Sequence, residues 1–441
     1  MLELFGSGLI SLWLDMAGVQ IKPMQAVDTL AWQAGTGLVL SPDPNPARGQ
    51  TIKEYLKELQ ALKLIKPEQT QVQGIWMQSG PILMANHQGT KPLPAASLTK
   101  IATSLVALKH WGHDHRFETL INATGPVKNG VLEGNLVVNA SGDPLFVWEE
   151  AITIGNMLNK MGIKRVNGNL VIVGEFAMNF QRNPQLAGQA LKRALNSSSW
   201  SRRIAFAHGR MSKGTLKPQV AISGKVEVKE EVETSQTQLI RHRSLPMVQL
   251  INEMNVFSNN EMAEMLAESV GGASVVQSRA AKLARVPQSE IQLINGSGLG
   301  QENLVSPRAA TAMLMAVQRL ATPHNLTVAD FFPTAGLDYR GTTYARRIPK
   351  NTAFKTGTLR DVSALAGVMP TKNRGLVWFA VINKGVFVPG FRSEQDKLLQ
   401  KMLAELKAPA DALTAVSPTE GKKAIPELGK ASRNEVLYNK S

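Results

Sequence analysis

Hydrophobic residues recur at helical spacing in some parts of the chain and form strand-like runs in others. The helical spacing predicts an amphipathic helix over residues 52–62 and a second helix over residues 98–108. Strand-like runs at 71–77 and 82–85 are joined by a turn at Ser79-Gly80-Pro81. Because these strands lead directly toward the second helix, the pattern predicts a β-hairpin packed beside that helix.

The middle of the chain changes to short strands and turns. The phrase GNLVV at 134–138 recurs as GNLVI at 168–172, and helical periodicity over 148–161 lies between the two phrases. This arrangement predicts a strand, a helix and a strand in that order. Alternating apolar residues from 220 to 232 predict a further strand pair that turns at Ser223-Gly224. We expect the whole segment to form a separate subdomain.

Helical periodicity resumes over residues 245–254, and the later runs VSALAGVM and GLVWFAVI predict two more strands. The pattern therefore indicates a main domain that is interrupted by a subdomain. We predict four parts. Residues 1–70 hold an N-terminal apolar segment, a loop and an amphipathic helix, and residues 71–116 and 244–406 form the main domain. Residues 117–243 form an inserted subdomain, and residues 407–441 form a flexible tail.

Residues 4–19 are mostly apolar and are similar to the hydrophobic part of a signal peptide. Glu3 stands where such signals carry positive charge, Asp15 interrupts the run, and the run is short for a membrane span. Two interpretations stay open. The segment is an export signal or interfacial anchor with peripheral membrane contact, or it is a helix that packs on the domain.

Composition narrows the class of protein. The chain has 441 residues, of which 43% are hydrophobic and 19% charged, as expected for a globular protein of two or three domains. It has no cysteine, which excludes disulfides and thiolate chemistry and fits an oxidising bacterial envelope compartment. The net charge of +15 indicates either simple solubility or attraction to a polyanion such as cell wall. No basic block is interleaved with aromatic residues, so nucleic-acid binding is not predicted.

The second predicted helix begins with an S-x-x-K tetrad, Ser97 to Lys100, and Pro94 stands just before it at a position that suits a helix start. Residues three apart share one face of a helix, which brings the Lys100 amine beside the Ser97 hydroxyl. A lysine can act as a base when burial and a second cation lower its pKa. The tetrad therefore predicts an activated serine nucleophile, and the alternative is an ordinary surface helix.

A second motif, Ser258-Asn259-Asn260, precedes the helical run EMAEMLAESVGG. An S-x-N motif at a helix start can present the Ser258 hydroxyl and the Asn260 carboxamide together. The alternative is a plain helix cap, in which Ser or Asn satisfies free N–H groups. Ser432-Arg433-Asn434 repeats the pattern in the tail, which shows that the motif arises without function as well.

The third motif is Lys355-Thr356-Gly357-Thr358, which precedes the strand-like run VSALAGVM. On a strand, Thr356 and Thr358 point to one face and Lys355 points to the other. Gly357 would let a substrate backbone approach closely. Two hydroxyls near an ammonium group make a seat for a carboxylate. The order S-x-x-K, S-x-N and K-T-G is the motif set of serine β-lactamases and penicillin-binding proteins.

At these residues the chain resembles the class C type low-molecular-mass penicillin-binding proteins, which are D-alanyl-D-alanine carboxypeptidases and endopeptidases. Further similar phrases are LPAASLTK, RFETLI, NLVVNASGDP, SNNEMAEML, NGSGLGQENLVSP and FKTGTLRDVSALAG, within residues 71–405. The resemblance implies an α/β (α+β) fold with a serine β-lactamase/transpeptidase-like domain, in which helices flank an antiparallel sheet. The long separation of Ser97 and Ser258 implies an inserted mixed α/β subdomain between the first and second motifs.

The resemblance also implies roles for the motif residues. Ser97 would attack the carbonyl between two D-alanines of a peptidoglycan stem peptide, and Lys100 would be the acylation base. Ser258 and Asn260 would relay protons to the leaving amine and hold the peptide. Lys355 would link to Ser258 and support the electrostatic field around Lys100.

The remaining roles belong to the third motif. Thr356 and Thr358 would bind the terminal carboxylate beside Gly357, and the backbone N–H groups of Ser97 and Thr358 would form the oxyanion hole. A β-lactam mimics the dipeptide and should acylate Ser97. Since this chemistry takes place outside the cytoplasmic membrane, the resemblance implies the periplasm or cell envelope. It implies no cofactor.

His110, His113 and His115 cluster at the end of the Ser97 helix. A zinc site is one interpretation, and cationic residues at a helix C-terminus are the other, which we prefer, so no metal is predicted.

Three departures from the family pattern leave substrate choice and rate open. Asn295 stands where Asp is usual, Gly300 replaces a common Ser, and Arg360-Asp361 follows K-T-G-T where small or uncharged residues are typical. The first hypothesis is therefore an active peptidase. The second is a catalytically weak or inactive homologue that serves as a wall-binding structural protein. A β-lactamase, distinguished by fast deacylation, is a third.

Overall fold

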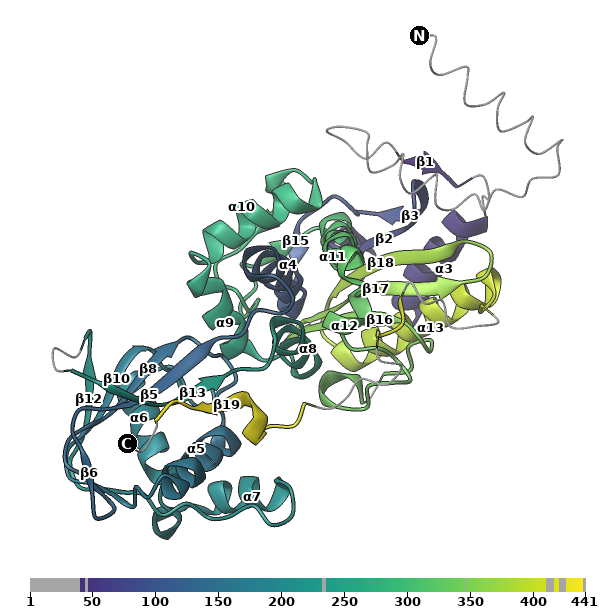
Figure 1. Ribbon diagram of the computed structural model, residues 1–441. Helices are drawn as coiled ribbons and strands as arrows, with labels where there is room; N and C mark the ends of the chain where they lie inside the picture. Colours follow the sequence, from purple (N-terminus) through teal and green to yellow (C-terminus); the bar gives the residue numbers. More distant parts are fainter. Residues whose placement is uncertain are drawn as a thin grey trace, which may run out of the picture.

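The computed structural model describes residues 40–43, 47–231, 235–344, 346–409, 416–419 and 426–438. Figure 1 shows two units at opposite ends of the molecule. The larger unit is built from segments on both sides of the middle of the chain, and the smaller unit is built mostly from the segment between them. The apolar segment at 4–19, interpreted above as a signal, an anchor or a packed helix, lies outside the described residues.

A six-stranded sheet forms the centre of the larger unit as the structure describes it. In spatial order its strands are β1 (Ser41–Pro42), β3 (Ile82–His87), β2 (Gly74–Ser79), β18 (Gly375–Lys384), β17 (Val362–Thr371) and β16 (Ala353–Leu359). Neighbouring strands are antiparallel except for β1 and β3. The predicted hairpin is confirmed as β2 and β3, but Gln71 and Val72 belong to the 3-10 helix η1 (Pro67–Val72) and not to a strand.

Helices cover both faces of this sheet (Figure 1). On one face lie α3 (Ala47–Ala61) and α13 (Val388–Leu406); on the other lie α4 (Thr99–Trp111), α8 (Met247–Phe257), α9 (Asn260–Ser269), α10 (Ala273–Ala284), α11 (Pro307–Ala321) and α12 (Val328–Phe331). Leu365 of β17 packs in the first layer, whereas Ala364 and Ala366 pack in the second. Since side chains alternate across a strand, these alanines let the second helical layer lie close to the sheet. The predicted antiparallel sheet flanked by helices is therefore confirmed.

A small sheet leads the chain into α4. It consists of β14 (Ile291–Gln292), β15 (Leu304–Val305) and β4 (Leu93–Pro94), and Pro94 pairs with Leu304. The expectation that Pro94 starts the helix is wrong, because Pro94 ends this strand and a 3-10 turn, η2 (Ala96–Leu98), separates it from α4.

The smaller unit contains a mixed sheet with helices packed against it. In spatial order its strands are β12 (Val226–Lys229), β10 (Leu170–Glu175), β8 (Leu136–Ser141), β5 (Glu118–Ala123), β13 (Thr237–Arg243) and β19 (Asn434–Val436). The helices of this unit are α5 (Trp148–Lys160), α6 (Pro184–Ala194) and α7 (Arg202–Arg210). Strands β8 and β10 are parallel and α5 connects them, which confirms the predicted strand, helix and strand.

The prediction that residues 220–232 form a strand pair is wrong. Strand β12 pairs with β10, whereas β11 (Ala221–Ile222) pairs with β9 (Arg165–Val166). Strand β9 in turn belongs to a second small sheet with β7 (Val131–Leu132) and β6 (Val127–Lys128). The turn at Ser223-Gly224 thus connects two sheets, since Ser223 N donates to Val166 O and Gly224 N donates to Gly168 O.

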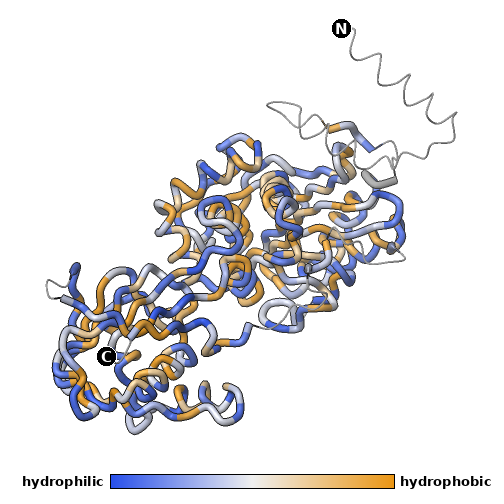
Figure 2. Tube along the Cα trace, viewed as in Figure 1, coloured by the Kyte–Doolittle hydropathy of each residue, from blue (hydrophilic) through white to orange (hydrophobic). Residues whose placement is uncertain are grey.

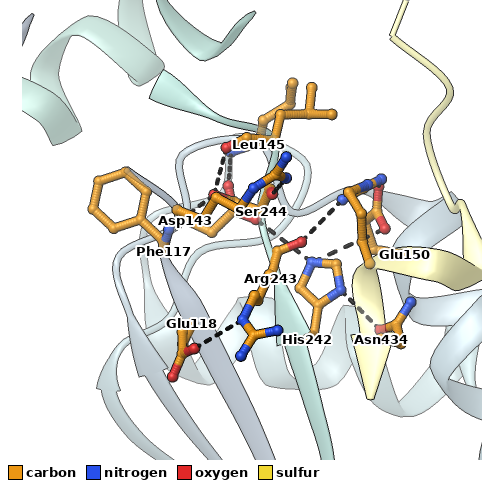
Figure 3. A network of polar contacts seen from close by, with 12 residues as sticks. Phe117, Glu118, Asp143, Leu145, Glu150, His242, Arg243, Ser244 and Asn434 are labelled. Atoms are coloured by element: carbon orange, nitrogen blue, oxygen red, sulfur yellow. Dashed lines mark hydrogen bonds and ion pairs between the residues drawn. The ribbon is translucent and has the colours of Figure 1, made fainter. Parts of the chain in front are cut away.

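The prediction of a flexible tail over 407–441 is wrong for part of that segment. Strand β19 pairs antiparallel with β13, and the 3-10 turn η8 (Ala431–Arg433) precedes it. Asn434 lies against His242, beside the buried Glu150 (Figure 3). The physical reason is that β13 would otherwise be an edge strand, and the tail satisfies its backbone hydrogen bonds.

Apolar segments gather along the inner strands and helices of both units (Figure 2). Among the described residues, the buried side chains form one core in the smaller unit and two in the larger, one on each face of its sheet. Within the described ranges, every helix is too short or too polar to cross a membrane.

Candidate active site

The turn η2 holds Ser97 at the junction of the small sheet and α4. Ala95 N donates to Asn303 O at 2.9 Å, and Ala95, Ala96 and Leu98 are fully buried. Ala96 has a φ of +49°, a left-handed conformation that an alanine rarely adopts and that a packed surrounding must impose. The backbone next to Ser97 is therefore fixed on both sides by the core.

Lys100 lies one turn further along α4 and is completely buried. Its Nζ donates to Ser97 Oγ at 3.0 Å, to Asn260 Oδ1 at 2.7 Å and to the Ser297 carbonyl at 2.7 Å. The predicted contact between the tetrad's serine and lysine is thus present in the structure. A neutral Lys100 amine in this position can accept the proton of the Ser97 hydroxyl.

Burial lowers the pKa of Lys100 to about 7, although the Glu264 carboxylate nearby acts to raise it. Glu264 also accepts hydrogen bonds from Gly296 N at 2.9 Å and Ser297 N at 3.0 Å. It therefore fixes the loop whose Ser297 carbonyl contacts Lys100. A substantial fraction of Lys100 is neutral near neutral pH, as a general base requires.

Ser258 and Asn260 occupy the corner between α8 and α9. Ser258 ends α8 with a φ of +52°, and Asn259 caps α9 by accepting a hydrogen bond from Met262 N at 3.0 Å. The capping role that we considered for this motif thus belongs to the middle residue alone. The side chains of Ser258 and Asn260 contact the two lysines of the site instead.

Lys355 lies on β16 and is completely buried. Its Nζ donates to Ser258 Oγ at 2.9 Å and to the Thr356 carbonyl at 2.9 Å. Burial lowers the pKa of Lys355 well below its usual value, and the charge of Lys100 lowers it further. The three motifs therefore meet at one place, with Ser97, Lys100 and Asn260 joined on one side and Ser258 and Lys355 on the other.

Strand β16 is the last strand of the large sheet, and η2 packs against β16 and its neighbour β17. A Cβ atom on Gly357 would lie 2.7 Å from the Ala95 carbonyl and 3.1 Å from Ala96 Cβ. Gly357 thus lets the turn that carries Ser97 approach the strand, and its expected contact with substrate stays a prediction. Thr356 donates to Thr342 Oγ1 at 3.0 Å, and Thr358 is exposed.

Sequence reasoning missed three residues of this site. Arg392 on α13 donates to Thr358 Oγ1 at 2.7 Å and adds a cation beside the expected carboxylate seat. Thr342 and Glu264 contact motif residues or the loop that holds them. Arg392 and Thr342 lie in no motif, and Glu264 lies in the phrase SNNEMAEML but outside its S-x-N motif, so only the fold brings the three to the site.

The departures from the family pattern lie together at one rim of the site. Asn295 Oδ1 accepts a hydrogen bond from Gly298 N at 2.8 Å, so the asparagine keeps an acceptor at that point. Gly300 has a φ of +108°, which side chains rarely adopt. Asp361, in the turn between β16 and β17, accepts a hydrogen bond from Gln301 Nε2 at 2.7 Å. None of these positions contributes to the contacts among the five motif residues.

The histidine cluster lies at the far end of α4 from Ser97. The rings of His113 and His324 are 4.2 Å apart, and the rings of His110 and His115 both contact Trp111. Across the part of the chain that the structure describes, no three His, Asp or Glu side chains are grouped to hold a metal ion.

The sequence matches the D-Ala-D-Ala carboxypeptidase 3 (S13) family over residues 63–177 and 178–406. It is 24% identical over 389 residues to D-alanyl-D-alanine carboxypeptidase DacB of Haemophilus influenzae, which covers 66% of this chain and 80% of that protein. It is 29% identical over 227 residues to a D-alanyl-D-alanine carboxypeptidase of Actinomadura sp., which covers 47% of this chain and 41% of that protein.

Solved structures share the fold. The Bd0816 predatory endopeptidase of Bdellovibrio bacteriovorus superposes with a TM-score of 0.65 at 20% identity, over 78% of this chain and 97% of that chain. Penicillin binding protein 4 of Haemophilus influenzae superposes with a TM-score of 0.58 at 20% identity, over 80% of this chain and 99% of that chain. With the three motifs assembled in space and the family match extending across both units, the chain belongs to the D-Ala-D-Ala carboxypeptidase 3 (S13) family.

Proposed function

We propose that this protein is a serine D-alanyl-D-alanine carboxypeptidase, with endopeptidase activity of the same kind, that hydrolyses peptidoglycan stem peptides through an acyl-serine intermediate. The observation that carries the proposal is the continuous set of contacts that joins Ser97, Lys100 and Asn260, with Ser258 and Lys355 beside them. We further propose that it acts in the periplasm or cell envelope, where peptidoglycan is found.

In the acylation step, neutral Lys100 takes the proton of Ser97 while Ser97 Oγ attacks the carbonyl carbon between the two D-alanines. The N–H groups of Ser97 and Thr358 stabilise the oxyanion that forms. The C–N bond then breaks, and Ser258, with Lys355 behind it, delivers a proton to the leaving amine. Water hydrolyses the acyl-serine ester and restores the free hydroxyl.

Substrate orientation depends on the carboxylate at the end of the stem peptide. Thr356 and Thr358 supply hydroxyl groups, and the Arg392 guanidinium, which contacts Thr358, supplies positive charge. This seat selects a substrate with a free carboxylate next to the scissile bond. A β-lactam carries a carboxylate in a similar place, so it should occupy the seat and acylate Ser97 irreversibly or slowly reversibly.

Fluorescent penicillin tests the proposal directly. The wild-type protein should be labelled covalently and should release D-alanine from a D-Ala-D-Ala pentapeptide, whereas Ser97→Ala should do neither. Folded wild-type protein that resists labelling and releases no D-alanine would support the wall-binding alternative. Rapid release of the hydrolysed label would instead indicate a β-lactamase.

A further inference from the structure

A large cavity lies between the smaller unit and the corner that joins α8 to α9. Its volume is about 1090 Å³. Residues of α7, of the start of α5, of the α8–α9 corner and of the tail line it, among them Arg203, Phe206, Arg210, Phe257 and Leu428. Ligand pockets for drug-sized molecules are commonly about 300–1000 Å³, so this cavity is far larger than one amino acid requires.

Exposed aromatic side chains concentrate in this cavity. The exposed fractions are 68% for Phe206, 49% for Phe257 and 38% for Phe180, and all three line it. Among the described residues, only Phe387 is a further phenylalanine with such exposure. Exposed apolar side chains gathered at one place mark a binding surface more often than scattered ones do.

The cavity wall on α7 is cationic. Arg203, Phe206 and Arg210 recur at helical spacing on one face, and the Arg210 guanidinium lies 5.8 Å from the centre of the Phe206 ring. Among the described residues Arg203 and Arg210 form no ion pair, although Glu149, Glu253 and Glu427 also line the cavity and the charge of Arg210 acts on Glu149. Exposed guanidinium groups beside aromatic rings suit a ligand that carries both carboxylates and apolar surface.

The opposite wall lies next to the active site in the chain. Phe257 and Asn259 line the cavity, while the Ser258 hydroxyl between them accepts a hydrogen bond from Lys355 Nζ. Arg340 lies over the Phe257 ring at 5.5 Å and is paired with Glu253. Two residues after Arg340, the Thr342 hydroxyl accepts the hydrogen bond from Thr356. The cavity therefore lies next to the corner that carries Ser258 and to the segment that leads from Arg340 to Thr342.

We infer that this cavity binds the leaving-group strand of a cross-linked peptidoglycan substrate, through carboxylates that contact Arg203 and Arg210. The inference rests on the proposed function, and what it adds is the place where the second strand of an endopeptidase substrate binds and the two arginines that would hold it. In a cross-link, the acyl carbon of D-alanine is bound to an amino group of a neighbouring stem peptide. Hydrolysis breaks that C–N bond, the amine receives a proton, and water completes the carboxylate on the D-alanine side. A single D-alanine leaving group would occupy little of the cavity, whereas a second stem peptide would extend into it.

Comparing two substrates distinguishes binding of the second strand in the cavity from catalysis. The double variant Arg203→Ala/Arg210→Ala should lower kcat/KM for a D,D-cross-linked muropeptide dimer about tenfold, mainly through KM, as two contacts worth roughly threefold each would. Its kcat/KM for a D-Ala-D-Ala pentapeptide and its labelling by fluorescent penicillin should stay within about twofold of wild type, because neither ligand reaches α7. Unchanged labelling also shows that the variant is folded.

The matched control is Arg279→Ala/Lys282→Ala, which removes the same charge from exposed positions on α10, outside the cavity. It should hydrolyse both substrates like wild type. A cavity variant that keeps the wild-type ratio of dimer to pentapeptide turnover would overturn the inference, and so would an equal loss in the control. If the wild type neither labels with penicillin nor releases D-alanine, the proposed function itself fails, which is a different result from an active enzyme that is indifferent to Arg203 and Arg210.

Discussion

Lys100 and Lys355 are two lysines that the fold removes completely from water. Burial lowers the pKa of both, and the positive charge of Lys100 is a further cause for Lys355. A buried ammonium group is costly, so such a pair is retained where chemistry needs a neutral amine at ordinary pH. The pKa of Lys100, about 7, places its change of charge in the range where enzyme assays are run.

The rate of penicillin acylation should therefore depend on the charge of Lys100. Below its pKa of about 7 the amine is protonated and cannot accept the Ser97 proton, and above it the amine is neutral. The acylation rate should therefore rise with pH through about 7 and then level off. Stopped-flow or gel-based labelling at a series of pH values measures this profile.

Lys100→Arg is the informative variant for this profile. Arginine keeps the positive charge but does not deprotonate in proteins, so labelling should be lost over the whole pH range. A wild-type rate that stays flat from about pH 5.5 to 8.5 would show that a group other than Lys100 takes the serine proton.

Gly298 is a second residue on which the site geometry depends. It has a φ of +81°, and a Cβ atom there would lie 1.9 Å from the Ala96 carbonyl, next to Ser97. Gly298→Ala should cost about 2 kcal/mol or more in unfolding free energy and slow penicillin labelling, because the loop that contacts Lys100 must move. Chemical denaturation and labelling rates measure the two effects.

Gly214→Ala separates the effect of the steric clash from the effect of the positive φ on stability and labelling. Gly214 has a similar φ of +86°, but a Cβ atom there would meet nothing within 4 Å. This variant should lose only about 1 kcal/mol and should keep wild-type labelling. Equal losses in the two variants would mean that the contact with Ala96 is unimportant.

At this scale the sequence predicted the residues that carry motifs and missed those that do not. Ser97 and Lys100 could be paired because a helix places residues three apart together. Ser258 and Lys355 could be included because the order of three motifs is informative. Arg392 could not, since its contact with Thr358 depends on how α13 packs across the sheet.

At the scale of elements, long periodic segments were predicted well and short pairings were not. The parallel pair of β8 and β10 followed from two similar phrases separated by a helical segment. Strand β11 has two residues and pairs with β9, far from it in sequence, so alternation alone could not identify its partner. Strand β19 is similarly short, and its partner β13 lies almost two hundred residues earlier.

The tail element is fixed by a buried ion pair as well as by its strand. Arg433 contacts the Glu150 carboxylate, which is 1% exposed and also accepts a hydrogen bond from Gly429 N at 2.9 Å. Figure 3 shows Glu150 beside His242 and Asn434. Arg433→Met should lower the unfolding free energy by about 3 kcal/mol, because it leaves a carboxylate buried without its cation. Thermal and urea denaturation check this value.

Two further variants test that explanation. Glu150→Gln combined with Arg433→Met should recover part of the lost stability, since the neutral amide needs no cation. Lys430→Met removes an exposed partner of Glu427 and should change stability by no more than about 0.5 kcal/mol. A small effect of Arg433→Met would indicate that β19 is held by its backbone pairing alone.

At the scale of the whole molecule, we propose that residues 71–116 and 244–406 form the catalytic domain and that residues 117–243 are an inserted subdomain. The two connections lie side by side, since Phe117 N donates to Ser244 Oγ and Ser244 N donates to Phe117 O, both at 2.9 Å. Phe117 belongs to the core of the larger unit. Away from these connections, polar contacts such as that of Arg182 with Glu268 join the units, and Leu145 and Val147 of the smaller unit pack in the core of the larger one.

This arrangement predicts that the insertion can be removed without destroying the catalytic centre. In the deletion variant, a Gly/Ser linker of about four residues replaces 118–243, and the chain ends after Thr419, because the later tail pairs with β13. The remaining protein should fold and label with fluorescent penicillin at a rate within about threefold of wild type, because every motif contact lies outside the deleted segment. It should lose any preference for cross-linked dimer over pentapeptide, since α7 supplies the cationic wall of the cavity.

A deletion variant that is folded by circular dichroism but cannot be labelled would show that the insertion shapes the active site itself, and the proposed domain boundary would then be wrong.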